Sequence, residues 1–443
     1  MKRQATAGEV DGERTIDRAM VRATVVISLF AAVASVSRVA QDAAIAWRYG
    51  TGPVVDAYQF LLTLVNWPAA FVLAMLTLLV PPAEASLRRQ GDGGLSLWRS
   101  EMFGWTLLVA VFALPFAWLA LHALVTSNLT GLQASAATFA ESGASQIVLA
   151  LPLTLVSAVM SAWLIASRRR VLTLLEALPP VAMVVLVLVS SGMVLFWGTT
   201  LVAGIQLVAL ACALRGTQSL PRPRLGTSSV EWVGFRQAAF TLLAGQMLFA
   251  LTPLVDPFFA ARLGEGQVAT LSYANRLVLG LLSLTGLGLQ RAGLPLLSQL
   301  MASNPAEARK TVLRWSLAAA GAGSLIGILI AALADPIVAG IFERGQFTQQ
   351  SREQVAALLR LGMLQLPVFL VGLVMVTALA SERAVGLLAI VTASGLLTKV
   401  VFSALLVPWL GVQGLLVATA LMYLVTALMA GFALRLRCAR LTP

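Results

Sequence analysis

The 443-residue chain is 59% hydrophobic and 11% charged, with a mean hydropathy of +0.88 and a net charge of +12. Soluble globular domains carry about 25% charged residues, so this composition excludes a soluble protein. Apolar stretches of roughly 20 residues, enough to cross a hydrocarbon core of about 30 Å, recur along the whole chain, whereas barrel strands would alternate apolar and polar residues. The sequence therefore predicts an all-α polytopic membrane protein.

The apolar stretches predict twelve spans in two equal groups, separated by the polar segment 215–236. This segment is expected to be a cytoplasmic linker between an N-lobe, 21–214, and a C-lobe, 237–434. Residues 1–20 and 435–443 are expected to form cytoplasmic ends. In chain order the expected spans are 21–48, 54–80, 102–125, 144–167, 171–192, 195–214, 234–261, 267–297, 314–334, 355–380, 385–407 and 412–434.

Basic residues are distributed unevenly between the segments that connect these spans. With the N-terminus inside, the external segments hold only Arg48, Arg262, Arg344 and Arg352, and most other Lys and Arg residues fall in cytoplasmic segments. The positive-inside rule therefore predicts that both termini are cytoplasmic. This topology accounts for the basic net charge, so we expect no nucleic-acid partner.

The first apolar run has no small-residue cleavage site after it and is interpreted as an uncleaved span. Cys212 and Cys438 are both predicted on the cytoplasmic side, where a disulfide is not expected. His122 is the single histidine, and the sequence contains no Cys/His cluster with metal-ligand spacing.

An internal repeat sets the expected architecture. The pattern Asp-x5-Arg-x-Gly-x-Gly-x-Val occurs twice, at a constant offset of 214 residues (256 − 42). Six spans per copy is an even number, so both copies enter the membrane in the same orientation. Parallel repeats of this kind are typical of transporters, in which substrate lies between two lobes that rock against each other. The matching pairs are Asp42 and Asp256, Arg48 and Arg262, Gly50 and Gly264, Gly52 and Gly266, Val54 and Val268, and Pro81 and Pro295.

Charged residues inside the spans indicate the class of substrate. A charge at the bilayer centre costs about 2.5–3.5 kcal/mol or more, so it usually faces a cavity or a partner. The cations outnumber the acids, which favours an anionic substrate, and the planar arginine fork suits phosphate. The embedded cations are Arg38, Arg276, Arg291, Arg360 and Lys399, and the main embedded acids are Asp42, Asp56 and Asp256.

Each charge also has a structural interpretation. Arg38 and Asp42 are four residues apart on one helix and could neutralise each other. Asp42 and Asp256 each precede a Gly-x-Gly turn and could brace the outer ends of spans one and seven. Arg360 lies near an external boundary, where its side chain could reach water. Turn and helix-packing roles are expected for Gly50, Gly52, Gly264 and Gly266.

The sequence offers no signs of enzyme chemistry. It contains no Gly-rich phosphate loop followed by lysine, and His122 has no partners for a catalytic triad. We therefore expect neither an enzyme nor a cofactor. Energy for transport would come from an ion gradient, the membrane potential or consumption of the product.

Three segments resemble the MviN/MurJ-type lipid II flippases. Residues 35–57 (SVSRVAQDAAIAWRYGTGPVVDA) are similar to the family's first-span signature, and 271–277 (LSYANRL) with 294–298 (LPLLS) are similar to its span-eight motif. Residues 341–348 (IFERGQFT) resemble the family pattern LFxxGxFT. The resemblance extends over roughly residues 20–437. It implies the fold of the multidrug/oligosaccharidyl-lipid/polysaccharide exporter superfamily, with two six-span lobes around a V-shaped central cavity.

The resemblance also implies roles for individual residues. Arg276 matches a family arginine that is thought to hold the pyrophosphate of an undecaprenyl-linked sugar. Asp42 and Asp56 match acidic positions near spans one and two, and Asn66 matches the asparagine that follows. Arg38, Arg291 and Lys399 are expected to add positive charge to the cavity.

The chain departs from the family pattern at several of these positions. Arg38 lies one helical turn from Ser35 and is expected to substitute for a family arginine there. The sequence contains no counterpart of the family's two additional C-terminal spans, which are implicated in holding the lipid tail. Ser35, Gln41, Ala69 and Ala70 stand where the family has arginines, and Asn275 and Leu279 replace acids that flank Arg276.

The sequence therefore predicts a multi-pass flippase of the bacterial inner membrane. Its expected cargo is an undecaprenyl-pyrophosphate-linked glycan precursor, lipid II or a related oligosaccharide, moved to the outer leaflet for peptidoglycan or surface-polysaccharide synthesis. Its expected partners are that substrate, membrane lipids and glycan-synthesis enzymes. The alternatives are an exopolysaccharide-unit flippase, a drug or metabolite antiporter that couples cations through Asp42 or Asp256, and a non-transporting scaffold.

Overall fold

The computed structural model describes residues 29, 32–90, 92–127, 129–167, 175–190, 192–215, 221–303, 305–382 and 385–439. This part of the chain is helical apart from short turns and the segment 221–230. The all-α fold class is confirmed. The N-terminal half contains a helix over 32–49, then α2 (Pro53–Gln90), α3 (Asp92–Thr126), α4 (Ala134–Ile147), α5 (Ala150–Ala166), α7 (Leu178–Val189) and α8 (Leu195–Arg215).

The C-terminal half begins with the long helix α9. A 3₁₀ turn, η1 (Ala261–Leu263), follows it. Gly411, in the left-handed region at φ 56°, separates the last two helices. The helices are α9 (Glu231–Ala260), α10 (Gln267–Ser303), α11 (Pro305–Ala332), α12 (Ala334–Phe342), α13 (Gln349–Gly362), α14 (Gln365–Ser381), α15 (Val385–Leu410) and α16 (Val412–Ala439).

The described helices coincide with the expected spans, although some spans are broken. The expected fourth span, 144–167, corresponds to α5 and the last turn of α4, and α4 and α5 meet at 52°. Eight described helices are long and apolar enough to cross a membrane, or ten if each bent pair is one span. The count of twelve therefore stays a prediction, because α7 is short and the start of the first expected span lies outside the described residues.

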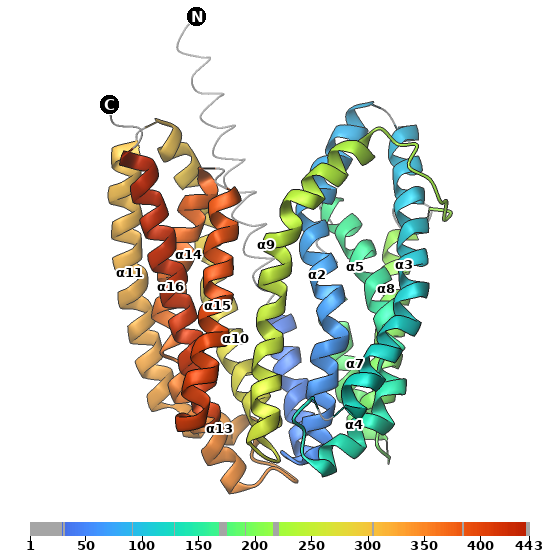
Figure 1. The fold of residues 1–443 in the computed structure, drawn as a ribbon, viewed down its shortest axis with the longest axis vertical. Helices are drawn as coiled ribbons and strands as arrows, with labels where there is room; N and C mark the ends of the chain where they lie inside the picture. Colours follow the sequence, from blue (N-terminus) through green and yellow to red (C-terminus); the bar gives the residue numbers. More distant parts are fainter. Residues whose placement is uncertain are drawn as a thin grey trace, which may run out of the picture.

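The helices form two lobes that meet at one end and separate at the other (Figure 1). We call these the closed end, near α4 and α13, and the open end. Apolar packing follows this division. One core cluster includes residues of both lobes, such as Ile45, Leu61, Tyr273 and Leu359. Away from it, one cluster belongs to the N-lobe together with Trp232 of α9 and another to the C-lobe, so among the described residues the core that joins the lobes is the first cluster.

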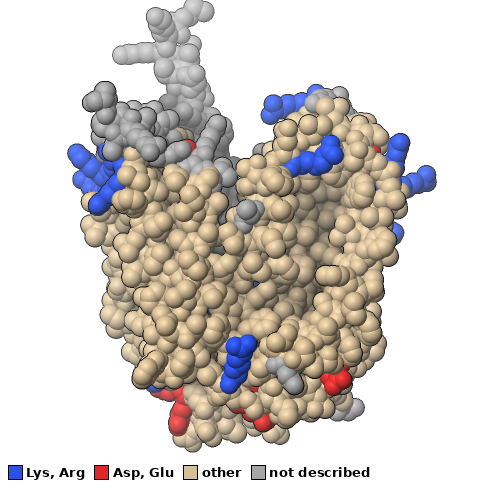
Figure 2. Space-filling model, in the orientation of Figure 1, with Lys and Arg blue, Asp and Glu red and all other residues tan. Residues whose placement is uncertain are grey.

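Charge is also divided between the two ends. On the face shown in Figure 2, basic side chains gather at the open end and acidic ones near the closed end, apart from one basic side chain lower on the surface. α2 ends with Arg88 and Arg89 at the open end. A notch separates the two lobes there (Figure 2).

Helix α9 connects the lobes. Glu101 of α3 accepts hydrogen bonds from the backbone N–H groups of Ser228 (2.8 Å) and Ser229 (3.1 Å) and from Trp232 Nε1 (2.7 Å). The carboxylate thereby satisfies N–H groups before and at the start of α9. α9 bends by 44° midway and packs against both α2 and α15. Its first turns, which begin inside the predicted linker at Glu231, are therefore held on the N-lobe.

Candidate functional site

At the closed end, a carboxylate of one lobe caps a helix of the other. Asp56, in the first turn of α2 and 2% exposed, accepts hydrogen bonds from the backbone N–H groups of Gly266 (2.5 Å) and Ala269 (2.7 Å). These groups lie at the start of α10, where N–H groups have no partner within the helix and the helix dipole favours negative charge. Asp56 therefore fastens the N-lobe to α10.

Three further contacts close this end. The Tyr273 hydroxyl donates to the carbonyl of Gly50 at 2.9 Å, and the backbone N–H of Gln346 donates to the carbonyl of Trp47 at 2.8 Å. The hydroxyls of Thr51 and Ser351 lie 2.9 Å apart. The segment 341–348, singled out by its sequence, is thus part of the closure.

Glycines of the repeat allow this close approach. Gly50 has a φ of 63°, and a Cβ there would lie 2.7 Å from the carbonyl oxygen of Gln346. Gly266 has a φ of 80°, and a Cβ there would lie 2.7 Å from the carbonyl oxygen of Thr51. Any side chain at either position would push the lobes apart. Gly52 and Gly264 lie in the same turns.

An ion pair between Asp42 and Arg276 joins the two halves deeper in the molecule. Arg276 Nε on α10 lies 2.6 Å from Asp42 Oδ2 on the helix 32–49. The Asp42 side chain is 1% exposed and that of Arg276 is 34% exposed. Among the described residues, Nε makes the hydrogen bond that holds Arg276. The ion pair thus engages Nε of this arginine, and a third of the side chain stays exposed.

Arg38 lies near this pair but does not neutralise Asp42. Among the described acids, Glu176 lies within ion-pair distance of Arg38, at 3.8 Å, and both side chains are about half exposed. Arg38 lies one helical turn before Asp42, which holds Arg276, so the two arginines are on the same part of the interlobe surface. The interpretation in which Arg38 and Asp42 compensate each other is therefore wrong, because Asp42 faces α10. Arg38 and Arg276 together form a partly exposed basic site, which we call the arginine pair.

Lys399 lies elsewhere, inside the C-lobe. Its side chain is 1% exposed, and Nζ lies 2.5 Å from Asp256 Oδ1. It also donates to the carbonyl of Leu415 (3.1 Å) and to the Thr419 hydroxyl. The ammonium therefore fills a shell of oxygen atoms from α9 and α16. Asp256, like its repeat counterpart Asp42, neutralises a cation and does not brace a helix end.

The remaining predicted residues are spread over the molecule. The Arg291 side chain lies outside the described residues, although its backbone belongs to α10. Arg360, on α13, pairs with Asp335, and both side chains are nearly half exposed. Asn66 is an exposed residue of α2.

Sequence reasoning missed several anchoring groups. Glu84, 1% exposed, forms a two-point ion pair with Arg99 at 2.7 and 2.6 Å. Glu101 anchors the start of α9, as described above. Both acids lie near predicted span ends, where charged residues are common. The hydropathy pattern therefore did not indicate that these two carboxylates are buried or ion-paired. The pairing of Thr51 with Ser351 spans 300 residues and had no signal either.

Comparison with known proteins shows which family the chain is similar to. The family model described as "Lipid II flippase MurJ" matches residues 58–440. A relative from Bdellovibrio bacteriovorus, described as a probable lipid II flippase MurJ, is 31% identical over 171 residues. That match covers 38% of this chain and spans only 32% of the length of the relative.

Solved structures share the fold at low sequence identity. A lipid II flippase MurJ in an inward closed conformation has a TM-score of 0.75 at 14% identity, covering 93% of this chain and 87% of that one. An inward-facing multidrug resistance MATE family transporter of the MOP superfamily has a TM-score of 0.76 at 14% identity, covering 91% and 95%.

The closed end should be lockable by a disulfide. Because the hydroxyls of Thr51 and Ser351 are 2.9 Å apart, cysteines at both positions should meet the distances that a disulfide needs. We expect Thr51→Cys/Ser351→Cys, with Cys212 and Cys438 replaced by serine, to cross-link on oxidation and lose transport. Reduction should restore transport.

The measurement is an oxidant titration that follows cross-linking by gel mobility and transport in the same vesicles. Each single-cysteine variant is the control and should keep its transport after oxidation. Full transport by the cross-linked double variant would show that the closed end does not need to open.

The Lys399–Asp256 pair should hold the C-lobe together. Lys399→Met leaves Asp256 without its cation, and breaking a buried pair costs about 3 kcal/mol or more. We expect a clear drop in the melting temperature of the purified protein, followed by tryptophan fluorescence. The double variant Asp256→Asn/Lys399→Met removes both charges and should recover most of the loss. Equal melting of Lys399→Met and the unmodified chain would exclude this role.

Proposed function

The chain belongs to the lipid II flippase MurJ family, and we propose that it moves an undecaprenyl-pyrophosphate-linked glycan precursor across the bacterial inner membrane. Lipid II or a related lipid-linked oligosaccharide is the cargo, and it travels from the cytoplasmic to the outer leaflet. The observation that carries this proposal is the Arg276 guanidinium, which Asp42 holds in place between the lobes while part of its surface stays exposed.

The open end faces the cytoplasm in this proposal. Arg88 and Arg89 lie there, as the positive-inside rule requires of cytoplasmic segments. The contacts of Asp56, Tyr273 and Gln346 would then close the outer side. Under this proposal, the open end would receive cargo from the cytoplasmic leaflet.

The arginine pair provides the chemistry for the head group. Pyrophosphate oxygens accept charge-assisted hydrogen bonds, and the planar guanidinium of Arg276 can donate two in parallel. Arg38 approaches from the other lobe, so an anion between the two arginines compensates both charges. An anionic cargo would thus draw the two lobes together around it, which couples binding to lobe movement. Lys399, whose charge is already compensated, has no contact with cargo in this mechanism.

The pairing of both repeat acids argues against the antiporter alternative. A coupling carboxylate must be able to exchange its cation, whereas Asp42 and Asp256 each hold a tethered cation of the chain itself. We therefore propose that neither acid is a cation-coupling site. The transport cycle would draw on an ion gradient or the membrane potential through other groups, without a cofactor.

Replacing Arg276 should abolish transport. We expect Arg276→Ala to lower flipping by at least about tenfold, since a hydrogen bond to a charged group contributes about 1.5–3 kcal/mol. Arg360→Ala is the matched control, because Arg360 is also an ion-paired, partly exposed arginine but lies on α13, away from Asp42. The measurement is growth of a strain depleted of its lipid II flippase, with the membrane level of each variant verified.

A further variant separates folding from function. Arg276→Ala leaves Asp42 buried without a cation, whereas Asp42→Asn/Arg276→Gln leaves no buried charge. We expect the double variant to reach the membrane at normal levels and still fail to flip cargo. Transport by this variant would remove the pair from the site. If the unmodified chain reaches the membrane but does not support growth, the cargo is another lipid-linked glycan or the chain is a scaffold.

A further inference from the structure

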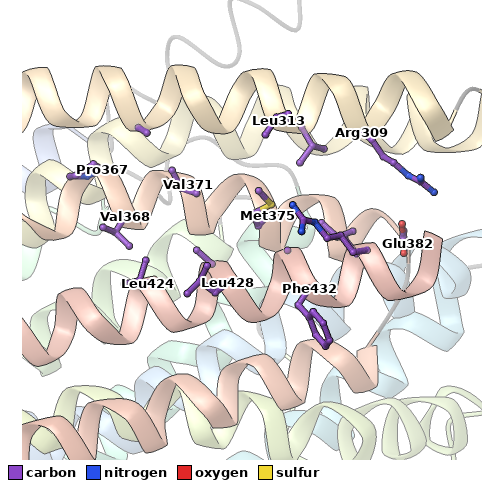
Figure 3. Close-up of a pocket in the computed structure, with 16 residues that line it drawn as sticks. Arg309, Leu313, Pro367, Val368, Val371, Met375, Glu382, Leu424, Leu428 and Phe432 are labelled. Atoms are coloured by element: carbon purple, nitrogen blue, oxygen red, sulfur yellow. The ribbon is translucent and has the colours of Figure 1, made fainter. Parts of the chain in front are cut away.

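A second concave site lies outside the path between the lobes. It is a groove of about 930 Å³ in the C-lobe, lined by α11, α14 and α16. Val368, Val371 and Met375 of α14 lie along it, with Leu313 of α11 and Leu428 of α16 on either side (Figure 3). Leu313 and Leu428 are 59% and 63% exposed, so the groove opens on the surface of the molecule.

The groove is separate from the arginine pair. Among the side chains that the structure describes, its lining includes none from the helix 32–49, α2 or α10. α14 packs against α10 as well as against α11 and α16. The groove and the interlobe surface therefore lie on different sides of the C-lobe helices, and the function proposed for Arg276 does not use the groove.

One end of the groove is charged and the rest is apolar. Arg309 lies near the start of α11, Glu382 caps the end of α14, and Arg435 lies near the end of α16. Arg309 and Glu382 lie together at one end in Figure 3, whereas Pro367 and Leu424 lie at the other. α14 and α16 both end at the open end of the molecule, where α11 begins. The charged end of the groove is therefore on the basic side of the protein.

The dimensions suit a lipid. The α14 residues that line the groove run from Pro367 to Glu382, about 22 Å at 1.5 Å per helical residue. One leaflet of hydrocarbon is about 15 Å thick. An acyl chain whose head group is held at the charged end would therefore reach the bilayer midplane while still inside the groove. Any exposed apolar surface in a membrane meets lipid. A defined concave channel with a basic end is what distinguishes a binding site from that general contact.

The charge at the mouth identifies the head group. Arg309 and Arg435 place two guanidinium groups at the mouth, and these complement the phosphodiester of an anionic lipid. A pyrophosphate carries more negative charge and would lie against Glu382, so the cargo of the interlobe site fits poorly here. The Glu382 carboxylate can instead accept a hydrogen bond from a head-group hydroxyl.

We propose that this groove binds an anionic phospholipid of the cytoplasmic leaflet, with its phosphodiester between Arg309 and Arg435 and an acyl chain along α14. A lipid with hydroxyls on its head group, such as phosphatidylglycerol, meets all three charged side chains. Because its chain contacts α11, α14 and α16 at once, the lipid fastens these helices to one another. It is a structural ligand of the C-lobe that moves with the lobe.

The test measures lipid binding to the full chain after delipidation in detergent. Phosphatidylglycerol, phosphatidylethanolamine and phosphatidylcholine are titrated separately, and bound lipids are counted by native mass spectrometry. We expect preferential binding of phosphatidylglycerol and a rise in melting temperature with this lipid. Arg309→Gln/Arg435→Gln should weaken its binding by about thirtyfold, since each basic residue near a membrane surface contributes about 1 kcal/mol.

Two further variants distinguish binding in the groove from attraction to the general surface charge. Lys310→Gln/Arg314→Gln removes the same charge from exposed residues of α11 that do not line the groove, and it should bind normally. Val371→Phe fills the channel, leaves the arginines in place and should reduce binding. Equal weakening by both double variants would reduce the effect to general surface charge and overturn the site. Equal binding of the three phospholipids would also overturn it, and neither result depends on whether the chain flips lipid II.

Discussion

The ion pair between Asp42 and Arg276 is the constraint on which the arrangement of the site depends. A carboxylate that is 1% exposed among membrane-spanning helices needs a partner, because an uncompensated buried charge costs several kcal/mol. Arg276 supplies that partner from the other half of the chain. The pair therefore fixes the approach of α10 to the helix 32–49. It also turns the rest of the guanidinium towards the space between the lobes, where an anion can reach it.

The two halves of the repeat have used the same acid in different ways. Asp42 meets a cation from the opposite half, whereas Asp256 meets Lys399 from its own lobe. The repeat position of Asp56 is Thr270, whose hydroxyl donates within α10 to the carbonyl of Gly266. One acid thus joins the lobes while its counterpart stabilises one of them. Duplication supplied a symmetric frame, and the site arises where the copies differ.

Much of the fold follows from the sequence, because apolar length and glycine–proline turns are local properties. Gly50 and Gly266 were identified from the repeat alone, and the structure places them where the lobes touch. Side-chain partners were harder to predict, because they depend on which helices face each other. The spacing of Arg38 and Asp42 predicted a pair, but α10 brings Arg276 closer. Lys399 looked like a cavity residue until α9 placed Asp256 against it.

The contacts at the closed end also define what an opposite state requires. Opening that end would break the two hydrogen bonds of Asp56 and those of Tyr273 and Gln346. Each net hydrogen bond contributes about 0.5–1.5 kcal/mol, so these four bonds together contribute a few kcal/mol, in addition to the apolar core that the lobes share there. Among these contacts, those of Asp56 cost the most free energy to break. Its carboxylate would lose its N–H partners on α10 and would have to be hydrated instead. In the proposed mechanism, an anion bound by Arg38 and Arg276 between the lobes supplies compensating interactions. α9, anchored on Glu101 in the N-lobe and packed on α15 in the C-lobe, is the helix that must change its bend as the lobes move.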